Sequence, residues 1–146
     1  MTTWIEHSSS LAEFPHTEFL TGGTKTAKIA YLSRKSSPLV SPIWFLLEND
    51  AILFQTGKSY EKGKYLLDNR DDMCICLDEE RPPYNFVQIR GKVEISEDEE
   101  LKKRVSLAIA EKYEGKDKAR EVSKMFSGPH VITVTLTPHR INYKIR

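Results

Sequence analysis

Strict alternation of apolar and polar residues near the C-terminal end is the feature that most constrains the fold of this chain. In the stretch 132–137, Ile, Val and Leu alternate with three threonines, and in 141–146, Ile, Tyr and Ile alternate with Asn, Lys and Arg. Side chains of a β-strand point alternately to its two faces, so this period of two predicts strands with one buried and one wet face.

The other predicted elements do not follow the strand–helix–strand order of a parallel sheet. Apolar and β-branched runs predict strands over 26–33, 39–47, 51–55, 73–77 and 84–95, the last with a bulge or bend at Gly91. Helices are expected over 11–20, interrupted or started at Pro15, from Ser59 to about Leu67, and behind a capping box at Ser96–Glu99. The pattern predicts one domain, 1–146, that is mainly β: an antiparallel barrel of six or seven strands with peripheral helices.

Composition limits the class of partner. The chain has 22 basic and 21 acidic residues, a net charge of +1, and therefore lacks the electrostatic footprint of a nucleic-acid-binding protein. No apolar run approaches the roughly 18 residues of a membrane span, and the N-terminal ten residues lack the features of a signal peptide. We expect a cytoplasmic protein that binds neither nucleic acid nor membrane, and any bound anion to be small.

The thiol and imidazole groups do not predict a metal site. Cys74 and Cys76 lie two residues apart in an apolar strand, on one face and poorly placed for a disulfide. The four histidines are scattered, whereas metal ligands recur at fixed spacings. Buried structural thiols are the expected outcome.

The segment 55–64 is the candidate anion site. A strand runs into a small-residue turn and a helix begins near Ser59, so backbone N–H groups at the helix start can face a phosphate. Gly57 allows close approach, and the segment is not a nucleotide P-loop, because its glycines are spaced wrongly and Tyr65 replaces the magnesium-binding hydroxyl. The alternative is a lysine-rich solvated helix. Candidate side chains are those of Thr56, Ser59, Lys58, Lys62 and Lys64.

Two further segments carry weaker signals. The predicted strand 39–47 is almost continuously apolar, so both its faces are expected to be covered, yet Pro42 interrupts it and belongs at an edge or bulge. Backbone groups freed there suit the rim of a flat heterocycle beside Trp44, although Trp44 is equally explained as core. The loop 78–84 is stiffened by paired prolines, as an interface or a plain connection would be.

Together these segments resemble the pyridoxamine 5′-phosphate oxidase-like superfamily of flavin-binding split barrels, in its small single-domain FMN- or coenzyme F-420-dependent branch. The resemblance covers Phe19 to Ile95. Four elements carry it in this order along the chain: Phe19–Leu20 with 28–30, then 40–45, then Thr56–Gly57 with 62–64, and finally 78–84 with 86–87 and Gly91. It implies a homodimeric split β-barrel with two cofactors at the subunit interface.

The resemblance also implies residue roles. Ser41, Pro42, Ile43 and Trp44 would line the flavin ring through backbone contacts. Thr56, Gly57, Glu61 and Lys62 would surround the phosphate, with Lys62 as the main cation, and 81–86, including Arg81 and Phe86, would approach from the partner subunit. The vitamin-forming oxidases carry arginine where this chain has Ser41 and Glu61, glutamine at Phe86, and a C-terminal extension that does not follow Arg146. Activity on pyridoxamine phosphate is therefore not expected, and Glu61 is expected to point away.

The resulting hypothesis is an oxidoreductase that moves hydride to or from a small organic substrate through FMN or, alternatively, the deazaflavin coenzyme F-420. In such enzymes the cofactor performs the redox chemistry and the protein supplies position and electrostatics. No side chain stands out as an obligatory acid or base, so the catalytic residues are unknown. Lys58 and Lys64 are candidates for the acidic tail of F-420, and FMN is favoured. The alternative function is a non-catalytic carrier or sensor that uses the same pocket.

Overall fold

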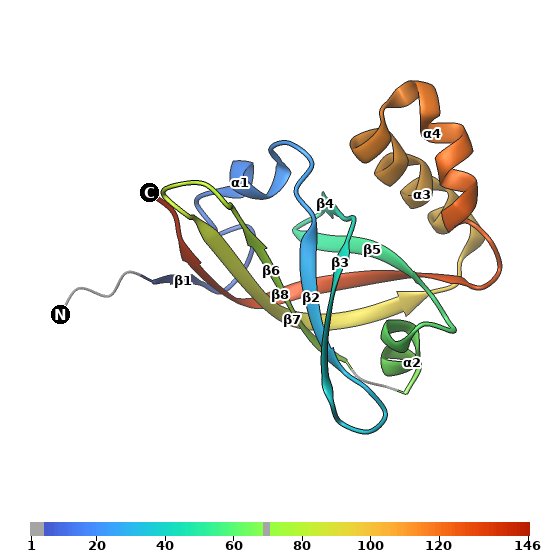
Figure 1. Ribbon diagram of the computed structural model, residues 1–146, viewed down its shortest axis with the longest axis horizontal. Coiled ribbons are helices and arrows are strands. Elements are labelled where there is room, and N and C mark those ends of the chain that lie inside the picture. The colour runs from blue at the N-terminus through green and yellow to red at the C-terminus, as the bar shows by residue number, and fades with distance from the viewer. Residues whose placement is uncertain (1–4, 69–70) are drawn as a thin grey trace.

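Eight β-strands of the computed structural model, which describes residues 5–68 and 71–146, form one antiparallel sheet (Figure 1). They are β1 (Glu6–Ser8), β2 (Ala27–Leu32), β3 (Pro38–Ile43), β4 (Leu46–Glu48), β5 (Ala51–Gly57), β6 (Asp72–Asp78), β7 (Phe86–Ser96) and β8 (Val131–Lys144). The order across the sheet is β3-β2-β6-β7-β8-β5-β4, and β1 pairs with β8 outside this path. The predicted mainly β, antiparallel architecture is confirmed.

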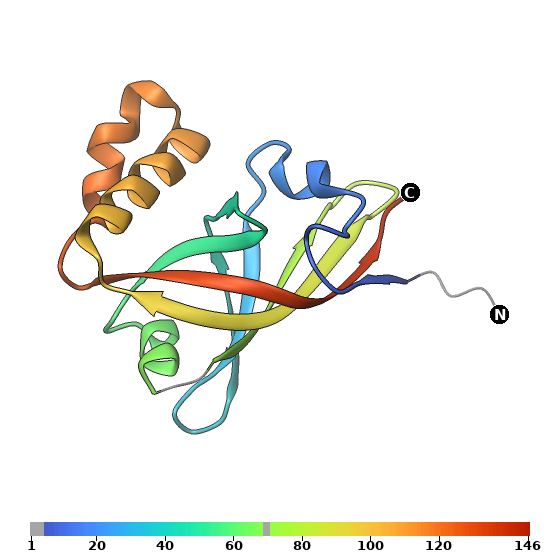
Figure 2. The same cartoon turned by 180° about the vertical axis from the view of Figure 1, so that it is seen from behind.

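The sheet curls into a half-barrel, as Figures 1 and 2 show from opposite sides. Its two end strands, β3 and β4, are joined by only two residues, so the chain itself brings the ends of the sheet together. Alternate side chains of the inner strands fill the concave side, where burial of apolar surface stabilises the fold. Fully buried members of this core include Ile29, Ile75, Ile89, Ile132 and Ile141.

The helices lie at the periphery of the sheet. They are α1 (Thr17–Thr21), α2 (Glu61–Leu67), α3 (Glu99–Glu114), α4 (Lys116–Ser123) and the 3₁₀ helix η1 (Lys124–Phe126). The unit formed by α3, α4 and η1, here called the helical arm, packs on the side of β5 that faces away from the main core, around Leu53, Val105 and Ile109. Figure 1 shows α2 and the arm on opposite sides of the end of β5. None of the described helices combines the length and apolar content of a membrane span.

The predicted strand 39–47 is divided into β3 and β4, with a break at Trp44–Phe45. β3 is an edge strand, so Pro42 withholds no N–H from the interior of the sheet. Val40 is 69% exposed, and the expectation that both faces of this strand are covered is wrong for the single chain.

The predicted irregularity at Gly91 is confirmed. Arg90 and Gly91 pair with Arg140 and Pro138, which leaves His139 of β8 as the extra residue of the bulge. A Cβ at position 91 would collide with the carbonyl oxygen of Thr137, so glycine is required for this close approach. The two predicted C-terminal strands are thereby one continuous strand, β8.

Two local predictions are corrected. The N-cap of α3 is Asp98, whose carboxylate accepts a hydrogen bond from the N–H of Leu101 at 2.8 Å, and Ser96 instead accepts from the N–H of Asp98. Cys74 and Cys76 are free and only half-buried, on the face of β6 opposite the core, and burial raises the pKa of both thiols. Sequence reasoning placed them inside because their neighbours are apolar on both sides.

Candidate functional site

A pocket of about 280 Å³ opens where the end of β3 faces the end of β5. Its wall combines residues from β3 and β5, the start of α2, the helical arm and the turn before β8. They are Pro42, Ile43, Trp44, Gln55, Thr56, Gly57, Tyr60, Lys62, Ile109, Met125, Phe126, His130 and Val131. Below, Thr56, Gly57, Tyr60 and Lys62 are called the α2 side, and Trp44, Ile109, Met125 and Phe126 the arm side.

Two polar groups of the α2 side lack partners among the described residues. Thr56 is 6% exposed, and its buried Oγ1 makes no hydrogen bond within the described chain. The half-buried Lys62 forms no ion pair with any described carboxylate; its ammonium lies 6.0 Å from the ring centres of Tyr31 and Tyr60. Burial lowers the pKa of Lys62, because desolvation disfavours the charged form. An anion bound here would pair with the Lys62 ammonium and accept a hydrogen bond from the Thr56 hydroxyl.

Close packing of α2 on β5 builds this side. A Cβ at Gly63 would collide with the carbonyl oxygen of Gly57, so glycine lets the first turn of α2 rest on the strand end. The N–H of Tyr60 donates to the Gly57 carbonyl at 3.2 Å, and the N–H of Lys58 donates to the His130 carbonyl at 2.8 Å. The turn is therefore tied to both β5 and the start of β8.

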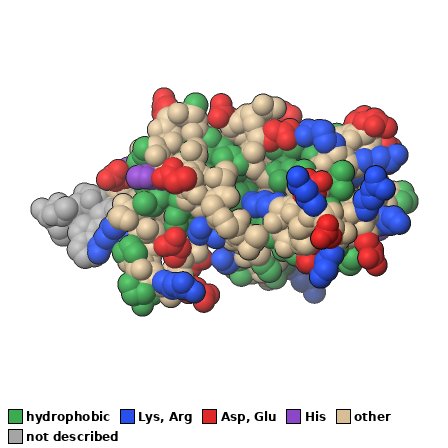
Figure 3. Space-filling model, turned by 90° about the horizontal axis from the view of Figure 1, so that it is seen from above, with side chains coloured by type: hydrophobic (Ala, Val, Ile, Leu, Met, Phe, Trp, Pro, Cys, Tyr) green, Lys and Arg blue, Asp and Glu red, His purple; other side chains and the backbone are tan. Residues whose placement is uncertain are grey.

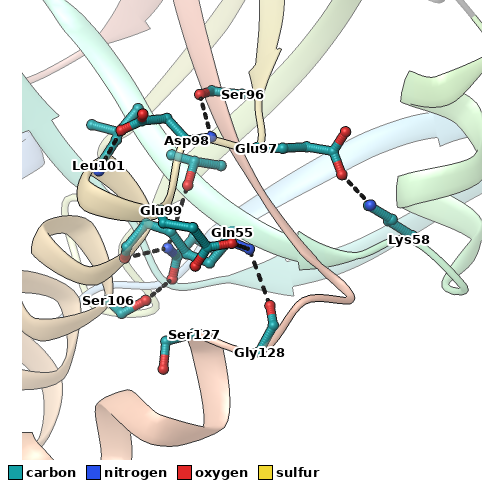
Figure 4. Close-up of polar contacts among 12 residues, drawn as sticks. Gln55, Lys58, Ser96, Glu97, Asp98, Glu99, Leu101, Ser106, Ser127 and Gly128 are labelled. Carbon is teal, nitrogen blue, oxygen red and sulfur yellow. Dashed lines mark hydrogen bonds and ion pairs between the residues drawn. The ribbon is translucent and has the colours of Figure 1, made fainter.

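The other two lysines of the segment are already paired. Lys58 forms an ion pair with Glu97, which lies just before α3 (Figure 4). Lys64 lies 3.8 Å from Glu61, its neighbour on α2, and neither residue lines the pocket. The geometry agrees with the expectation that Glu61 points away from an anion near Lys62.

The break between β3 and β4 is held by the end of α3. The N–H of Phe45 donates to the Tyr113 hydroxyl at 3.3 Å, and Lys112 Nζ donates to the Phe45 carbonyl at 2.8 Å. The Tyr113 hydroxyl in turn donates to the carbonyl of Lys25 at 2.7 Å. Backbone groups were predicted to be free beside Pro42. Those of Phe45 are not free, because Tyr113 and Lys112 of α3 bond to its N–H and its carbonyl.

Lys112 is a half-buried cation outside the pocket lining. Its ammonium lies 3.8 Å from the centre of the Phe45 ring. Burial, and then repulsion from Lys25, lower the pKa of Lys112 to about 8. The ring face opposes this shift by favouring the charged form.

Apart from Trp44, the arm side of the pocket was missed by sequence reasoning. The Trp44 ring stacks on Tyr113 with 4.8 Å between centroids and 4° between planes, and Phe126 lies 5.8 Å from it. Ile109 lies in the helix that was predicted behind the capping box, but no local pattern marks Met125, Phe126, Val131 or His130 as lining residues. Gln55 and Tyr60 were not named as lining side chains either, although both lie within the predicted segment 55–64, and that signal could have found them.

A buried polar network joins the arm to the sheet beside the pocket (Figure 4). Gln55 Nε2 donates to the carbonyl of Lys102 at 3.1 Å, and Ser106 Oγ lies 2.9 Å from Gln55 Oε1 and 2.7 Å from the carbonyl oxygen of Phe126. The Lys102 side chain is 1% exposed, and its ammonium contacts Glu99 at 3.2 Å and the carbonyl of Gly128 at 3.1 Å. Buried polar groups that are satisfied in this way fix one arrangement of the chain.

The predicted cofactor-binding residues divide into two sets. Those that the structure brings together at the pocket are Pro42, Ile43, Trp44, Thr56, Gly57 and Lys62. Those that do not line it are Ser41, Ser59, Glu61, Lys64, Arg81 and Phe86. Ser41 has a buried hydroxyl without a described partner, while Arg81 belongs to the β6–β7 connection and Phe86 begins β7, at the end of the sheet away from the pocket (Figure 1). Contact of all twelve with a cofactor stays a prediction.

A second pocket, of about 410 Å³, has a polar lining that includes His7, Glu13, His139 and Arg140. Basic and acidic side chains are interspersed over the face seen from above in Figure 3. Within residues 5–68 and 71–146, no group of three or more His, Cys, Asp or Glu side chains is placed to hold a metal ion.

Solved structures share this architecture. A conserved hypothetical protein from Mycobacterium tuberculosis superposes with a TM-score of 0.76 at 20% identity, over 94% of this chain and 86% of that one. An F-420 reductase gives 0.65 at 19%, over 85% and 94%, and a heme storage protein from Vibrio cholerae gives 0.64 at 16%, over 84% and 86%. At these identities the likeness concerns the fold.

Sequence comparison is more specific. No curated protein sequence matches the chain. Residues 16–143, from the start of α1 almost to the end of β8, match the profile of the family described as pyridoxamine 5′-phosphate oxidase. The half-barrel and its pocket lie within that match, and the chain belongs to the pyridoxamine 5′-phosphate oxidase family.

Proposed function

We propose that the pocket binds the phosphate-bearing flavin FMN and that the protein is an oxidoreductase moving hydride to or from a small organic substrate. The observation that carries this proposal is the pair of unsatisfied groups on the α2 side: Lys62, a half-buried cation without a described carboxylate partner, and the buried Thr56 hydroxyl without a hydrogen bond. Unpaired buried polar groups are costly, so native structures retain them where a ligand completes them.

The residues of the pocket fit such a cofactor. Lys62 supplies a charge-assisted contact to a phosphate, Thr56 a hydroxyl, and Gly57 a backbone that a ligand can approach closely. Pro42, Ile43 and Trp44 offer a flat apolar rim for the ring system. A bound flavin would supply the acceptor and donor of a hydride, which no side chain of this pocket provides.

The choice of FMN over coenzyme F-420 rests on the other lysines. F-420 carries an acidic tail, and its binding would require cations besides the one that meets its phosphate. Lys58 is engaged by Glu97 and Lys64 by Glu61, so neither is free for a tail. Family membership and the fold likeness to an F-420 reductase support the flavin class, while the likeness to a heme storage protein makes heme the competing cofactor.

A non-catalytic carrier or sensor is the second candidate. The pocket lining contains no carboxylate or thiol, and its acid–base groups other than Lys62 are Tyr60 and His130, both exposed. A site that only holds a cofactor has no need of a shielded proton donor. Turnover therefore decides between the two functions.

We also propose that the protein works as a homodimer. β3 presents an unpaired edge with Val40 exposed, next to the pocket mouth. Arg81 and Phe86 lie away from the pocket of their own chain, so a second copy is required for either to reach a cofactor. Light scattering on the purified protein tests this, and a monomer at all concentrations would contradict it.

The experiment for the cofactor is identification of what the native protein carries. Mass spectrometry of the ligand released by heat, followed by titration with FMN, F-420 and heme, is expected to identify FMN. Binding of heme with no flavin, or of none of the three, would overturn the proposal. Oxidation of reduced nicotinamide by the FMN-loaded protein with a panel of small acceptors is expected for the oxidoreductase, and binding without turnover identifies the carrier.

A further inference from the structure

The arm side of the pocket differs in chemistry from the α2 side. Its side chains, those of Trp44, Ile109, Met125 and Phe126, are all apolar, whereas the α2 side holds the cation Lys62. Met125, at the edge of the pocket, is 70% exposed. Such a surface gains free energy when an apolar molecule covers it.

The aromatic part of this side is fixed in place. The Trp44 ring stacks on Tyr113, whose hydroxyl is held by the carbonyl of Lys25 at 2.7 Å, and the Phe126 ring is tilted by 54° to that of Trp44. A rigid aromatic wall binds flat molecules at a low cost in conformational entropy.

The segment that carries Met125 and Phe126 is also held from beneath. Ser106 Oγ contacts the carbonyl oxygen of Phe126 at 2.7 Å, and Lys102 Nζ donates to the carbonyl of Gly128 at 3.1 Å (Figure 4). Both side chains belong to α3 and are buried. Ser106 and Lys102 are therefore positioning residues, which set the wall before any ligand arrives.

We propose that the arm side is the substrate subsite, with Trp44 shared between it and the flavin ring, and that it selects an uncharged, planar, apolar molecule. The inference rests on the proposed function, in which the phosphate of FMN occupies Lys62. Lys58 is paired with Glu97, and Lys58, Lys112 and Lys124 all lie outside the pocket lining. Among the described residues, no cation therefore lines the arm side to compensate the desolvation of an anionic substrate.

Calorimetric titration of the FMN-saturated protein with two redox-inert probes, naphthol and naphthalenesulfonate, tests this selection. Naphthol is expected to bind at least about tenfold more tightly. Met125→Lys is expected to reduce that preference by roughly tenfold, because it adds a cation to the subsite. Leu107→Lys, a similar change at an exposed apolar position of α3 outside the pocket, is the matched control and is expected to leave it unchanged.

Three results would overturn the proposal: equal binding of the two probes, equal effects of Met125→Lys and Leu107→Lys, or displacement of FMN by naphthol. Failure of the proposed function is distinguishable, because it appears as absence of FMN binding. In that case Met125→Lys and Leu107→Lys are each combined with Lys62→Met and compared without FMN. The α2 side of these variants no longer carries the cation that would attract the sulfonate. The preference for naphthol and its loss in Met125→Lys alone are still the expected results.

Discussion

The two sides of the pocket differ in how the chain builds them. The α2 side comes from one short segment, 56–62, in which a strand end, a turn and a helix start follow directly. The arm side brings together Trp44, Ile109 and the pair Met125–Phe126, which are far apart in the sequence. Local chemistry therefore specifies the first side, and tertiary packing of the arm on β5 specifies the second.

The polar groups of the two sides differ in the same way. On the α2 side, Lys62 has no described ion pair and the Thr56 hydroxyl no described hydrogen bond. In contrast, Gln55, Ser106 and Lys102 beside the arm side are satisfied by side chains and by the backbone. Unsatisfied groups mark where a ligand completes the protein, and satisfied ones mark the scaffold. Substitutions on each side test this distinction.

The largest effect is expected from Gly63→Ala on the α2 side. The added methyl group collides with the Gly57 carbonyl, which is backbone and has little freedom to move. We expect the free energy of unfolding, measured by urea denaturation, to fall by about 3 kcal/mol. Gly57→Ala is the control, because its methyl group meets the His130 ring at an ordinary contact distance of 3.7 Å and the Tyr60 ring at 3.2 Å, and the exposed Tyr60 side chain can turn away. Similar costs for both substitutions would contradict the packing described here.

Ser106→Ala tests the scaffold role of the arm side with an intermediate effect. The substitution leaves either Gln55 Oε1 or the Phe126 carbonyl without its donor in a buried site. We expect a loss of about 1–2 kcal/mol in the free energy of unfolding. Ser123→Ala removes a hydroxyl that donates within an exposed turn of the same arm, to the carbonyl of Arg120, and is expected to cost less than about 0.5 kcal/mol. A Ser106→Ala protein as stable as Ser123→Ala would sink the scaffold interpretation.

The smallest effect concerns the pH dependence of the joint between α3 and β3. The pKa of Lys112 is about 8 in the folded protein, below its value of about 10.4 when unfolded. The buried charge therefore costs stability below about pH 8, and this cost disappears as the pH rises from about 8 to about 10.4. Solvent screening of the half-exposed side chain limits the gain to about 1 kcal/mol.

Urea denaturation of wild type and Lys112→Met at pH 7 and pH 9.5 measures this gain. The free energy of unfolding of wild type relative to Lys112→Met is expected to be larger at pH 9.5 than at pH 7. The same difference for Lys116→Met, a substitution at an exposed position of α4, is expected not to change with pH. If the stability difference between wild type and Lys112→Met does not change with pH, or changes in the opposite direction, the attraction of the Phe45 ring for the charged lysine outweighs the cost of burying it.

Much of the fold is predictable because its signals are local. The alternation in β8, the bulge at Gly91 and the start of α2 all follow from neighbouring residues, and all are confirmed. The division of 39–47 into two strands is not local, since it depends on Lys112 and Tyr113 binding the backbone of Phe45. The exposure of Val40 is equally hidden, because an apolar edge strand has the sequence of a buried one.

The candidate site divides along the same line. Thr56, Gly57 and Lys62 were predicted from one segment and lie together at the pocket. Met125 and Phe126 were not, because nothing near them in the sequence tells which strand the arm covers. Whether Lys58 and Lys64 are free to bind a ligand also depends on the carboxylates beside them. Lys64 pairs with Glu61 of the same helix, but Lys58 pairs with Glu97, which lies far along the chain, just before α3.

The central claim is that Lys62 holds the phosphate of a flavin, and paired titrations with FMN and with riboflavin, which lacks the phosphate, test it most directly. Wild type is expected to bind FMN more tightly than riboflavin. Lys62→Met is expected to weaken FMN binding by about tenfold and leave riboflavin binding unchanged, because one charge-assisted contact is lost. Lys64→Met, which removes a lysine paired with Glu61, should alter neither. Equal affinities of wild type and Lys62→Met for FMN, or an equal loss for riboflavin, would contradict the claim.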